Sequence, residues 1–308
     1  MQELLENSNL AAALHDSLLS KRVSELVFVA FDTEATGRHP IISGILEISA
    51  VKFNSKGEIL DIRTELINPE RQIPEEVIAV HGINDEMVAQ KLPAREIIPG
   101  FVEWMQFSNT GQPNIFVAHN AIFDVSFLQV ALTRCGRSLP DNPVLDTLML
   151  ARQLFDKTEN HRLKTLVEHL GHSDGEVVFH RAEADSIHAM KVFVEMLRML
   201  GDDSTLGELI ELAGVTFFSK PFEEIVDFAT SSNSKVQRIG ESINSGSDLF
   251  IHYRGHGVKF RQVTPLSVLY SRRRYYLRAY CHAAGNERTF RINRISSLEM
   301  VDRLQVGN

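Results

Sequence analysis

Residues 27–34 read VFVAFDTE, a run of apolar and β-prone residues that ends in two acidic ones. Such a run predicts a strand that is buried on both faces. Because side chains alternate along a strand, Asp32 and Glu34 are expected to point the same way. Burying like charges side by side is costly without a cation, and oxygen ligands at a strand end suit Mg²⁺ or Mn²⁺. The alternative is a strand that simply ends in a polar turn at Thr36 and Gly37.

The composition is that of an ordinary globular protein with one or two domains. The chain has 308 residues, of which 44% are hydrophobic and 23% are charged. No apolar run reaches membrane-spanning length, and the acidic N-terminus lacks the basic start and apolar core of a secretion signal. Cys135 and Cys281 lie far apart with no CxxC motif, which predicts reduced thiols in a cytoplasmic protein rather than a zinc site.

The net charge of −8 is unevenly distributed along the chain. Residues 217–308 hold 14 Lys and Arg against 8 Asp and Glu, which leaves 18 against 32 for residues 1–216. A basic part of +6 and an acidic part of −14 predict two units with different partners. An acidic body can still act on a polyanion when bound metal ions and a basic neighbouring domain offset the repulsion.

Hydrophobic periodicity and turn residues divide the chain into four segments. We expect a helical N-terminal extension over residues 1–24, with a helix from about 8 to 22, and an α/β domain over residues 25–203. A helical linker over 204–246 and a small β domain over 247–308 follow.

The α/β domain is predicted from strands and helices that alternate after an initial run of strands. Antiparallel strands are expected at 27–34, 45–53 and 59–68, and further strands at 114–119 and 144–146. Helices are expected at 74–80, 84–90, 121–135, 147–155, 163–170 and 181–200. This order indicates helices packed on a mixed sheet. The short strands expected at 249–253, 258–263, 267–271, 275–281, 288–292 and 297–301 indicate a small, strongly bent β-barrel.

Two further acidic residues stand at the starts of predicted helices. Asp124 and Asp185 each lie in or near a first turn, where an acidic residue is often only a favourable partner of the helix dipole. If they converge with Asp32 and Glu34 at one edge of the sheet, the four carboxylates supply the oxygen ligands that two Mg²⁺ ions need. His180 would then stand near the attacking water, and an imidazole suits a general base near neutral pH.

Three segments carry a family resemblance, namely DTEATG at 32–37, HNAIFD at 119–124 and HRAEAD at 180–185. They resemble the three motifs of the DEDDh exonuclease superfamily, which includes the proofreading epsilon subunit of bacterial DNA polymerase III. The resemblance spans about residues 25–200 and includes HGIN at 81–84 and LDT at 145–147. It implies an RNase H-like fold, 3′→5′ exonuclease activity and two Mg²⁺ or Mn²⁺ ions. The metal ligands it implies are Asp32, Glu34, Asp124 and Asp185, with His180 as the base.

The same resemblance implies contacts with the 3′-terminal nucleotide. The residues concerned are Thr36, Glu47, His81 and Asn120. The alternative for Glu47 is a strand residue that faces solvent, and the alternative for His81 is a turn before a glycine in the left-handed conformation. The position after Glu34 holds Ala35 where the family usually has Thr, but this position is not a ligand.

The C-terminal segment combines arginines with aromatic residues. Residues 249–301 hold ten Lys and Arg, which alternate with tyrosines and phenylalanines. Guanidinium groups beside aromatic rings suit phosphate contact and base stacking. The alternative is a solvated basic face over an aromatic core.

This segment also resembles the WYL domain, in IHYRG at 251–255, VTPL at 263–266, YYLRAY at 275–280 and RTFRINRI at 288–295. Tyr275 stands where the name-giving triad has Trp. The resemblance implies an Sm/SH3-like fold, a bacterial source and a single-stranded nucleic-acid or nucleotide ligand. The ligand residues it implies are Tyr253, Arg278, Arg291 and Arg294.

The sequence therefore predicts a metal-dependent 3′→5′ exonuclease that acts on single-stranded or frayed DNA ends, with a C-terminal nucleic-acid-binding module and no membrane partner. Two alternatives stay open. One is an exoribonuclease that trims RNA, because nothing in the sequence reads the 2′-hydroxyl. The other is a non-catalytic WYL regulator, although ligand binding alone does not require His180 together with four acidic residues.

Overall fold

The computed structural model describes residues 16–38, 40–172, 180–213, 215–216, 224–225, 228, 231–255, 257–271 and 274–301. The chain divides into two compact units, Met1–Lys220 and Pro221–Asn308. The division falls within the segment expected as a linker. Of the predicted N-terminal helix, the part before residue 16 lies outside the described residues, and α3 spans Asp16–Leu19.

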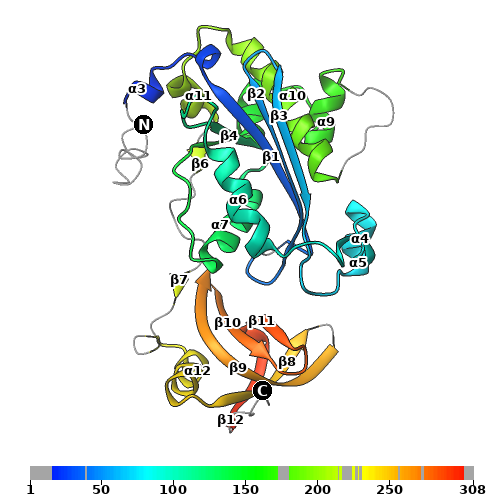
Figure 1. Ribbon diagram of the computed structural model, residues 1–308, viewed down its shortest axis with the longest axis vertical. Coiled ribbons are helices and arrows are strands. Elements are labelled where there is room, and N and C mark those ends of the chain that lie inside the picture. Colours follow the sequence, from blue (N-terminus) through cyan, green and yellow to red (C-terminus); the bar gives the residue numbers. More distant parts are fainter. Residues whose placement is uncertain are drawn as a thin grey trace. The chain divides into compact units, whose positions relative to one another are not determined.

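The first unit is built on a six-stranded mixed sheet with the order β3-β2-β1-β4-β5-β6 (Figure 1). The strands are β1 (Val27–Ala35), β2 (Ile45–Asn54), β3 (Ile59–Leu66), β4 (Ile115–Ala118), β5 (Val144–Asp146) and β6 (Val215–Thr216). β1, β2 and β3 pair antiparallel, as predicted, whereas β4 runs parallel to both β1 and β5. The predicted mixed α/β fold of the RNase H-like type is confirmed.

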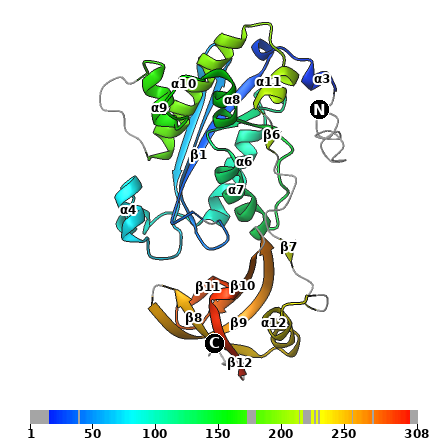
Figure 2. The ribbon, with the colours of Figure 1, turned by 180° about the vertical axis from the view of Figure 1, so that it is seen from behind.

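Helices cover both faces of this sheet (Figures 1 and 2). One face packs against α6 (Ala94–Gln106) and α7 (Ile122–Arg134). The other packs against α8 (Thr147–Leu154), α9 (Leu163–His169), α10 (Ala182–Leu200) and α11 (Leu206–Ala213). The short helices α4 (Glu75–His81) and α5 (Asp85–Val88) follow β3. β1 serves both layers, because Phe28 and Ala30 face one and Val29 and Phe31 face the other.

Helix α6 is absent from the sequence prediction, and the reason is local. Pro99 and Gly100 stand in its middle, and both residues disfavour a helix interior. Its buried residues nevertheless follow helical spacing, at positions 98, 101, 102 and 105. Pro99 has no N–H for the carbonyl of Arg95, four residues earlier, and the Cys135 thiol donates to that oxygen instead, at 3.9 Å. A contact 40 residues away thus accommodates the proline.

The second unit is an antiparallel sheet with the order β11-β10-β9-β8-β12, beside which β7 (Glu224–Ile225) pairs with β9. The strands are β8 (Asp248–Gly255), β9 (Gly257–Ser271), β10 (Arg274–Cys281), β11 (Asn286–Arg291) and β12 (Ile295–Val301). Helix α12 (Ser234–Ser245) places Val236 and Ile239 in the core of this unit, whereas α11 packs in the first unit. The predicted linker helices are therefore divided between the two units.

Strand β9 is continuous where the sequence predicted two strands. Its pairing with β10 shifts register so that Ser267 lies opposite Arg278 and Pro265 opposite Ala279. Leu266 is the extra residue of this β-bulge, and the bulge accommodates Pro265, which has no N–H to donate. In the described part of the chain, no helix combines the length and apolar character that crossing a bilayer requires.

The aromatic cluster of Phe28, Phe53 and Phe193 joins β1 and β2 to α10, with ring centroids 5.1 to 6.2 Å apart. All three rings are fully buried. We expect Phe193→Ala to lower the free energy of unfolding by about 3–5 kcal/mol, because it leaves a cavity in this core. Urea denaturation followed by circular dichroism measures the change. Phe193→Leu, which keeps most of the volume, should cost clearly less, and equal losses for the two variants would contradict a packing role.

Candidate active site

Four predicted acidic residues gather at the carboxyl ends of β1 and β4. Asp32 and Glu34 lie on one face of β1, Asp124 lies in the first turn of α7 after β4, and Asp185 lies in the first turn of α10. β1 and β4 are parallel, so their carboxyl ends share one edge of the sheet. Burial raises the pKa of Asp32 well above its ordinary value, and the charges of the other three acidic residues raise it further. The structure thus brings all four together.

Asp124 is held in place by β1 itself. Its Oδ1 accepts hydrogen bonds from the backbone N–H of Thr33 at 2.8 Å and from the Thr33 hydroxyl at 2.7 Å. Burial raises the pKa of Asp124 to about 7, although these two hydrogen bonds oppose the shift. Without a nearby cation, the charged form of the Asp124 carboxylate is therefore disfavoured.

Glu34, His180 and Asp185 form the closest part of the cluster. Each offers a ligand atom, and these atoms lie within 4.8 Å of one another. Burial raises the pKa of Glu34 to about 8, and the neighbouring charges of Asp185 and Asp124 add to the effect. A bound divalent cation would lower these raised pKa values, because it favours the charged form of every carboxylate around it.

The turn before α10 carries His180 in a left-handed conformation, with φ of 63°. Such a conformation costs energy for a residue with a side chain and is often found at functional sites. The backbone N–H of His180 donates to Oδ2 of Asp185 at 2.9 Å, so the turn and the acid fix each other. The His180 side chain itself is exposed.

Asp185 gives a direct test of whether the cluster fits a cation. Its Oδ1 is buried and has no hydrogen-bond partner among the described residues. Nδ1 of His188 lies 3.9 Å away, which is beyond hydrogen-bond length. A buried carboxylate oxygen without a partner, in a cluster of acids, fits a divalent ion with oxygen ligands such as Mg²⁺ or Mn²⁺.

Glu47 is fully occupied by protein partners. It lies opposite Glu34 in the pairing of β1 and β2, and its side chain is only 1% exposed. Its two oxygens accept from the guanidinium of Arg181 at 2.6 and 3.1 Å and from the backbone N–H of Ala182 at 2.9 Å. Glu47 therefore does not face solvent, and it fastens the start of α10 to the sheet.

The other predicted substrate residues lie in different surroundings. Thr36 is buried, and its hydroxyl accepts from the backbone N–H of Gly44 at 2.9 Å. Asn120 is exposed, with φ of 61°. His81 is buried at the end of α4, where its Nδ1 accepts from Ile83 N–H at 3.0 Å. Its Nε2 therefore carries the hydrogen of the neutral ring and has no partner among the described residues.

Sequence reasoning missed several residues that support the site. Asp146 accepts from the backbone N–H groups of Asn120, Ala121 and Leu148, so it fixes the loop after β4 and caps α8. His119 lies 2.9 Å from the Thr147 hydroxyl, and burial lowers its pKa to about 4. His119 and Asp146 both lie within the motifs quoted above. A polar residue directly after a buried strand is the sequence signal that could have identified them.

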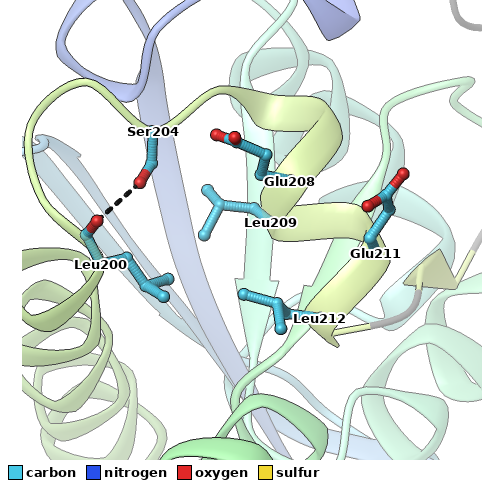
Figure 3. A pocket seen from close by; sticks show the side chains of 6 residues that line it. All are labelled: Leu200, Ser204, Glu208, Leu209, Glu211 and Leu212. Atoms are coloured by element: carbon cyan, nitrogen blue, oxygen red, sulfur yellow. Dashed lines mark hydrogen bonds between the residues drawn. The ribbon is translucent and has the colours of Figure 1, made fainter.

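A surface pocket of about 560 Å³ lies elsewhere in the first unit (Figure 3). Its lining residues are Leu200, Ser204, Glu208, Leu209, Glu211 and Leu212. The Ser204 hydroxyl donates to the carbonyl of Leu200 at 2.9 Å and closes the turn at its rim. None of the predicted site residues lines this pocket.

The predicted ligand residues of the second unit are only partly available to contact a ligand. The ring of Tyr253 contacts Phe290 edge-on, and its hydroxyl accepts from the backbone N–H of Arg291 at 3.3 Å. Arg278 and Arg291 lie on one face of the β10–β11 pair, and Nε of Arg291 is buried without a partner among the described residues. Arg294 is exposed at the short helix before β12.

This fold and this cluster define an exonuclease-type domain. Residues 29–193 match the family model described as an exonuclease, RNase_T, and this match covers more than half of the chain. The chain therefore belongs to this exonuclease family. Residues 234–300 match the model of the WYL domain.

Bacterial proteins are among the relatives of this chain. The chain is 36% identical over 177 residues to the PolC-type DNA polymerase III of Bacillus cereus, covering 57% of this chain and 12% of that protein. It is 35% identical over 189 residues to a DNA polymerase III subunit epsilon-like protein of Rhodobacter capsulatus, covering 60% of this chain and 25% of that one. The matched region is thus a small part of each relative.

Solved structures show the same fold. The nuclease domain of 3′hExo, a DEDDh family member bound to rAMP, superposes with a TM-score of 0.50 at 21% identity, covering 57% of this chain and 94% of that one. A structure of exonuclease I superposes with a TM-score of 0.50 at 14% identity, covering 80% and 55%.

The raised carboxyl pKa values predict how stability depends on pH without metal. Glu34 ionises near 4.5 when unfolded but only near 8 in the folded protein. Between these values the folded state holds more protons, so the free energy of unfolding should fall as pH rises through this range. Thermal melting in EDTA at about pH 5 and about pH 8 measures this fall. Addition of Mn²⁺ should raise Tm more at the higher pH, since the ion binds the ionised carboxylates.

Glu34→Gln should flatten the pH dependence in EDTA, whereas the exposed control Glu103→Gln should leave it unchanged. A pH profile of Tm that is the same for wild type and Glu34→Gln would contradict the burial of this charge.

Proposed function

We propose that the chain is a Mg²⁺- or Mn²⁺-dependent 3′→5′ exonuclease that releases nucleoside monophosphates from single-stranded or frayed DNA ends. The observation that carries this proposal is the gathering of Asp32, Glu34, Asp124 and Asp185 beside His180, in a chain of the exonuclease family. The names of the polymerase relatives favour DNA as the substrate.

The acidic residues would hold two metal ions, and their placement supports this role. Oδ1 of Asp185, which has no partner among the described residues, and the second oxygen of Asp124 offer ligand atoms, and Asp32 and Glu34 complete the set. Held by these carboxylates, two ions would supply an activated water and would stabilise the leaving 3′ oxygen in an in-line displacement at phosphorus. The fold would hold the four carboxylates so close together that bound cations are needed to balance their negative charge.

His180 is proposed as the general base. Its ring can approach Glu34 and Asp185, which would stand at the ions, and its turn is fixed by the hydrogen bond from its own N–H to Asp185. The exposed imidazole can take the proton of the attacking water and pass it to solvent. His81 is proposed to donate to the terminal nucleotide from its Nε2–H, which has no partner among the described residues, and Thr36 and Asn120 are proposed to line the nucleotide site. Glu47, whose carboxylate is already bound by Arg181 and by the N–H of Ala182, is proposed to position the start of α10 beside that site rather than to contact the nucleotide.

The second unit is proposed to bind single-stranded nucleic acid or a nucleotide. Arg278 and Arg291 share a face, and Nε of Arg291, which has no partner in the described part of the chain, is a donor suited to a phosphate. With Arg294 and Tyr253 these residues form the proposed ligand face. Such a unit would tether the substrate or regulate its access.

We expect Asp32→Ala to abolish hydrolysis and leave the fold intact, because it removes a metal ligand from the cluster. We expect His180→Ala to lower kcat by at least about 100-fold, the usual scale of a general base. Stepwise shortening of a 5′-labelled oligonucleotide measures both, with the exposed Asp141→Ala as control. Wild-type turnover by Asp32→Ala would refute the metal role, and an unchanged kcat for His180→Ala would remove this residue from the mechanism.

Parallel digestion of labelled DNA and RNA oligonucleotides of one sequence tests the substrate. Faster RNA digestion would favour RNA trimming, in line with the rAMP-bound neighbour. If neither polymer loses mononucleotides in Mn²⁺, and EDTA changes nothing, the chain acts as a WYL-type regulator on a nuclease fold.

We expect the double variant Arg291→Ala and Arg294→Ala to bind single-stranded DNA more weakly and with a flatter salt dependence. Each lost phosphate contact reduces the slope of log K against log salt by roughly 0.7 for single strands. Fluorescence anisotropy at several salt concentrations measures the slope, and Arg238→Ala on α12 is the matched control. A slope equal to that of wild type would assign these arginines to structure.

A further inference from the structure

Three aromatic rings form an exposed group on strands β8 and β9. Phe260 is 63% exposed and Phe250 is 39% exposed, which is unusual for phenylalanine. The ring of Phe260 lies parallel to that of His252, at 4.3 Å and 12°, and to that of Phe250, at 5.7 Å and 12°. We call Phe250, His252 and Phe260 the aromatic column.

The strand register holds the column in place. Phe250 and His252 are two residues apart on β8 and therefore share a face, and Phe260 lies directly opposite His252 on β9. The hydroxyl of Ser296 lies 2.7 Å from Nδ1 of His252 and donates to the carbonyl of the same residue at 3.1 Å. The rings are therefore stacked and oriented before any ligand arrives, which lowers the entropy cost of binding.

The exposed rings differ from three other aromatic residues of this unit. Tyr276 is fully buried, and Phe290 is 4% exposed and packs in the core. Tyr253 packs against that core and uses its hydroxyl on Arg291. These three residues contribute to the core and so stabilise the fold. Core packing does not explain why Phe250 and Phe260 are exposed.

Charge decides what could cover the column. Residues 249–301 hold ten Lys and Arg against two Asp and Glu. Arg254 is exposed two residues beyond His252 on the same face of β8, whereas Glu299 lies opposite Phe250 on β12. The whole second unit, residues 221–308, holds 13 Lys and Arg against 8 Asp and Glu, so a second copy of this unit would be repelled. A polyanion with flat apolar groups matches both the charge and the rings.

We propose that the aromatic column is a stacking platform for unpaired nucleobases of single-stranded nucleic acid, made of residues other than those of the hydrolytic site and of the arginine face of β10 and β11. The proposal deepens the nucleic-acid binding proposed above and rests on it. The bases stack on the ring surface that the column leaves exposed, and the backbone runs toward Arg254, away from Glu299. Stacking is indifferent to base identity, so the platform binds strands of any sequence.

The test uses the full chain with Asp32→Ala in EDTA, so that the probe is not cut. Binding of 5′-fluorescein oligo-dT of about 12 nucleotides is followed by anisotropy. Phe260→Ala should weaken binding by about fivefold or more, the range for loss of one stacked base. Phe260→Tyr should bind like the parent, and Leu266→Ala, which alters an exposed apolar residue of the same strand, should have no effect.

An oligomer of abasic sugar-phosphate separates stacking from charge. Phe260→Ala and its parent should bind this oligomer equally, and their salt slopes should coincide, because no phosphate contact is lost. Equal affinities for oligo-dT, or no binding of oligo-dT by the parent, would overturn the proposal. If sedimentation shows that Phe260→Ala dissociates a dimer while oligo-dT binding is unchanged, the column is a contact between copies.

The binding test of the aromatic column does not depend on whether the nuclease proposal is correct. In the chain with Asp32 intact, hydrolysis of the nitrophenyl ester of thymidine 5′-monophosphate reports on the hydrolytic site alone. Phe260→Ala should keep the wild-type rate on this ester. If the wild-type chain lacks that hydrolysis, the nuclease proposal fails, and the anisotropy result still decides the role of the column.

Discussion

Repulsion among buried carboxylates is the constraint on which the first unit depends. Asp32, Glu34 and Asp124 all have pKa values raised by burial, and in Asp32 and Glu34 the neighbouring acids add to the shift. Left alone, such groups would separate or take up protons. They stay together because β1 is fixed between two apolar layers and because α7 and α10 start at the same sheet edge. The apolar core thus supplies the free energy that keeps an unfavourable charge cluster assembled.

Polar anchors stand directly behind the clustered acids and explain how the cluster is kept in register. Thr33 donates twice to Asp124, so the strand that carries Asp32 and Glu34 also positions the acid of α7. Glu47 accepts from Arg181 and from Ala182 N–H, which ties the turn of His180 and the start of α10 to β2. Because Glu47 is buried, loss of Arg181 would leave an unpaired charge inside the protein, a costly outcome. The anchors therefore constrain geometry as well as stability.

The sequence predicted what depends on local pattern and missed what depends on distant contacts. Strands β1 to β5 and most helices of the first unit follow from period and turn residues, and the four acids could be named from their positions after strands and in first helical turns. Strands β6 and β7, by contrast, lie in the segment that was expected to be helical. Helix α6 was missed because its proline is accommodated by Cys135, and continuous β9 because Pro265 lies at a bulge. The partner of Glu47 is 134 residues away, so burial of that carboxylate could not be read from β2 alone. Alternation identified aromatic faces in the second unit but not which rings the fold leaves exposed.

The distribution of charge and rings suggests why two units occur in one chain. Under the proposed function, the acidic cluster would attract a polyanion only through bound cations, and this attraction would weaken as salt screens it over about 8 Å at physiological ionic strength. A basic unit adds attraction but is screened in the same way. Stacking on exposed rings depends on surface burial rather than on charge, so salt affects it little. A module that combines arginines with the aromatic column would therefore retain a strand under conditions in which charge alone would release it.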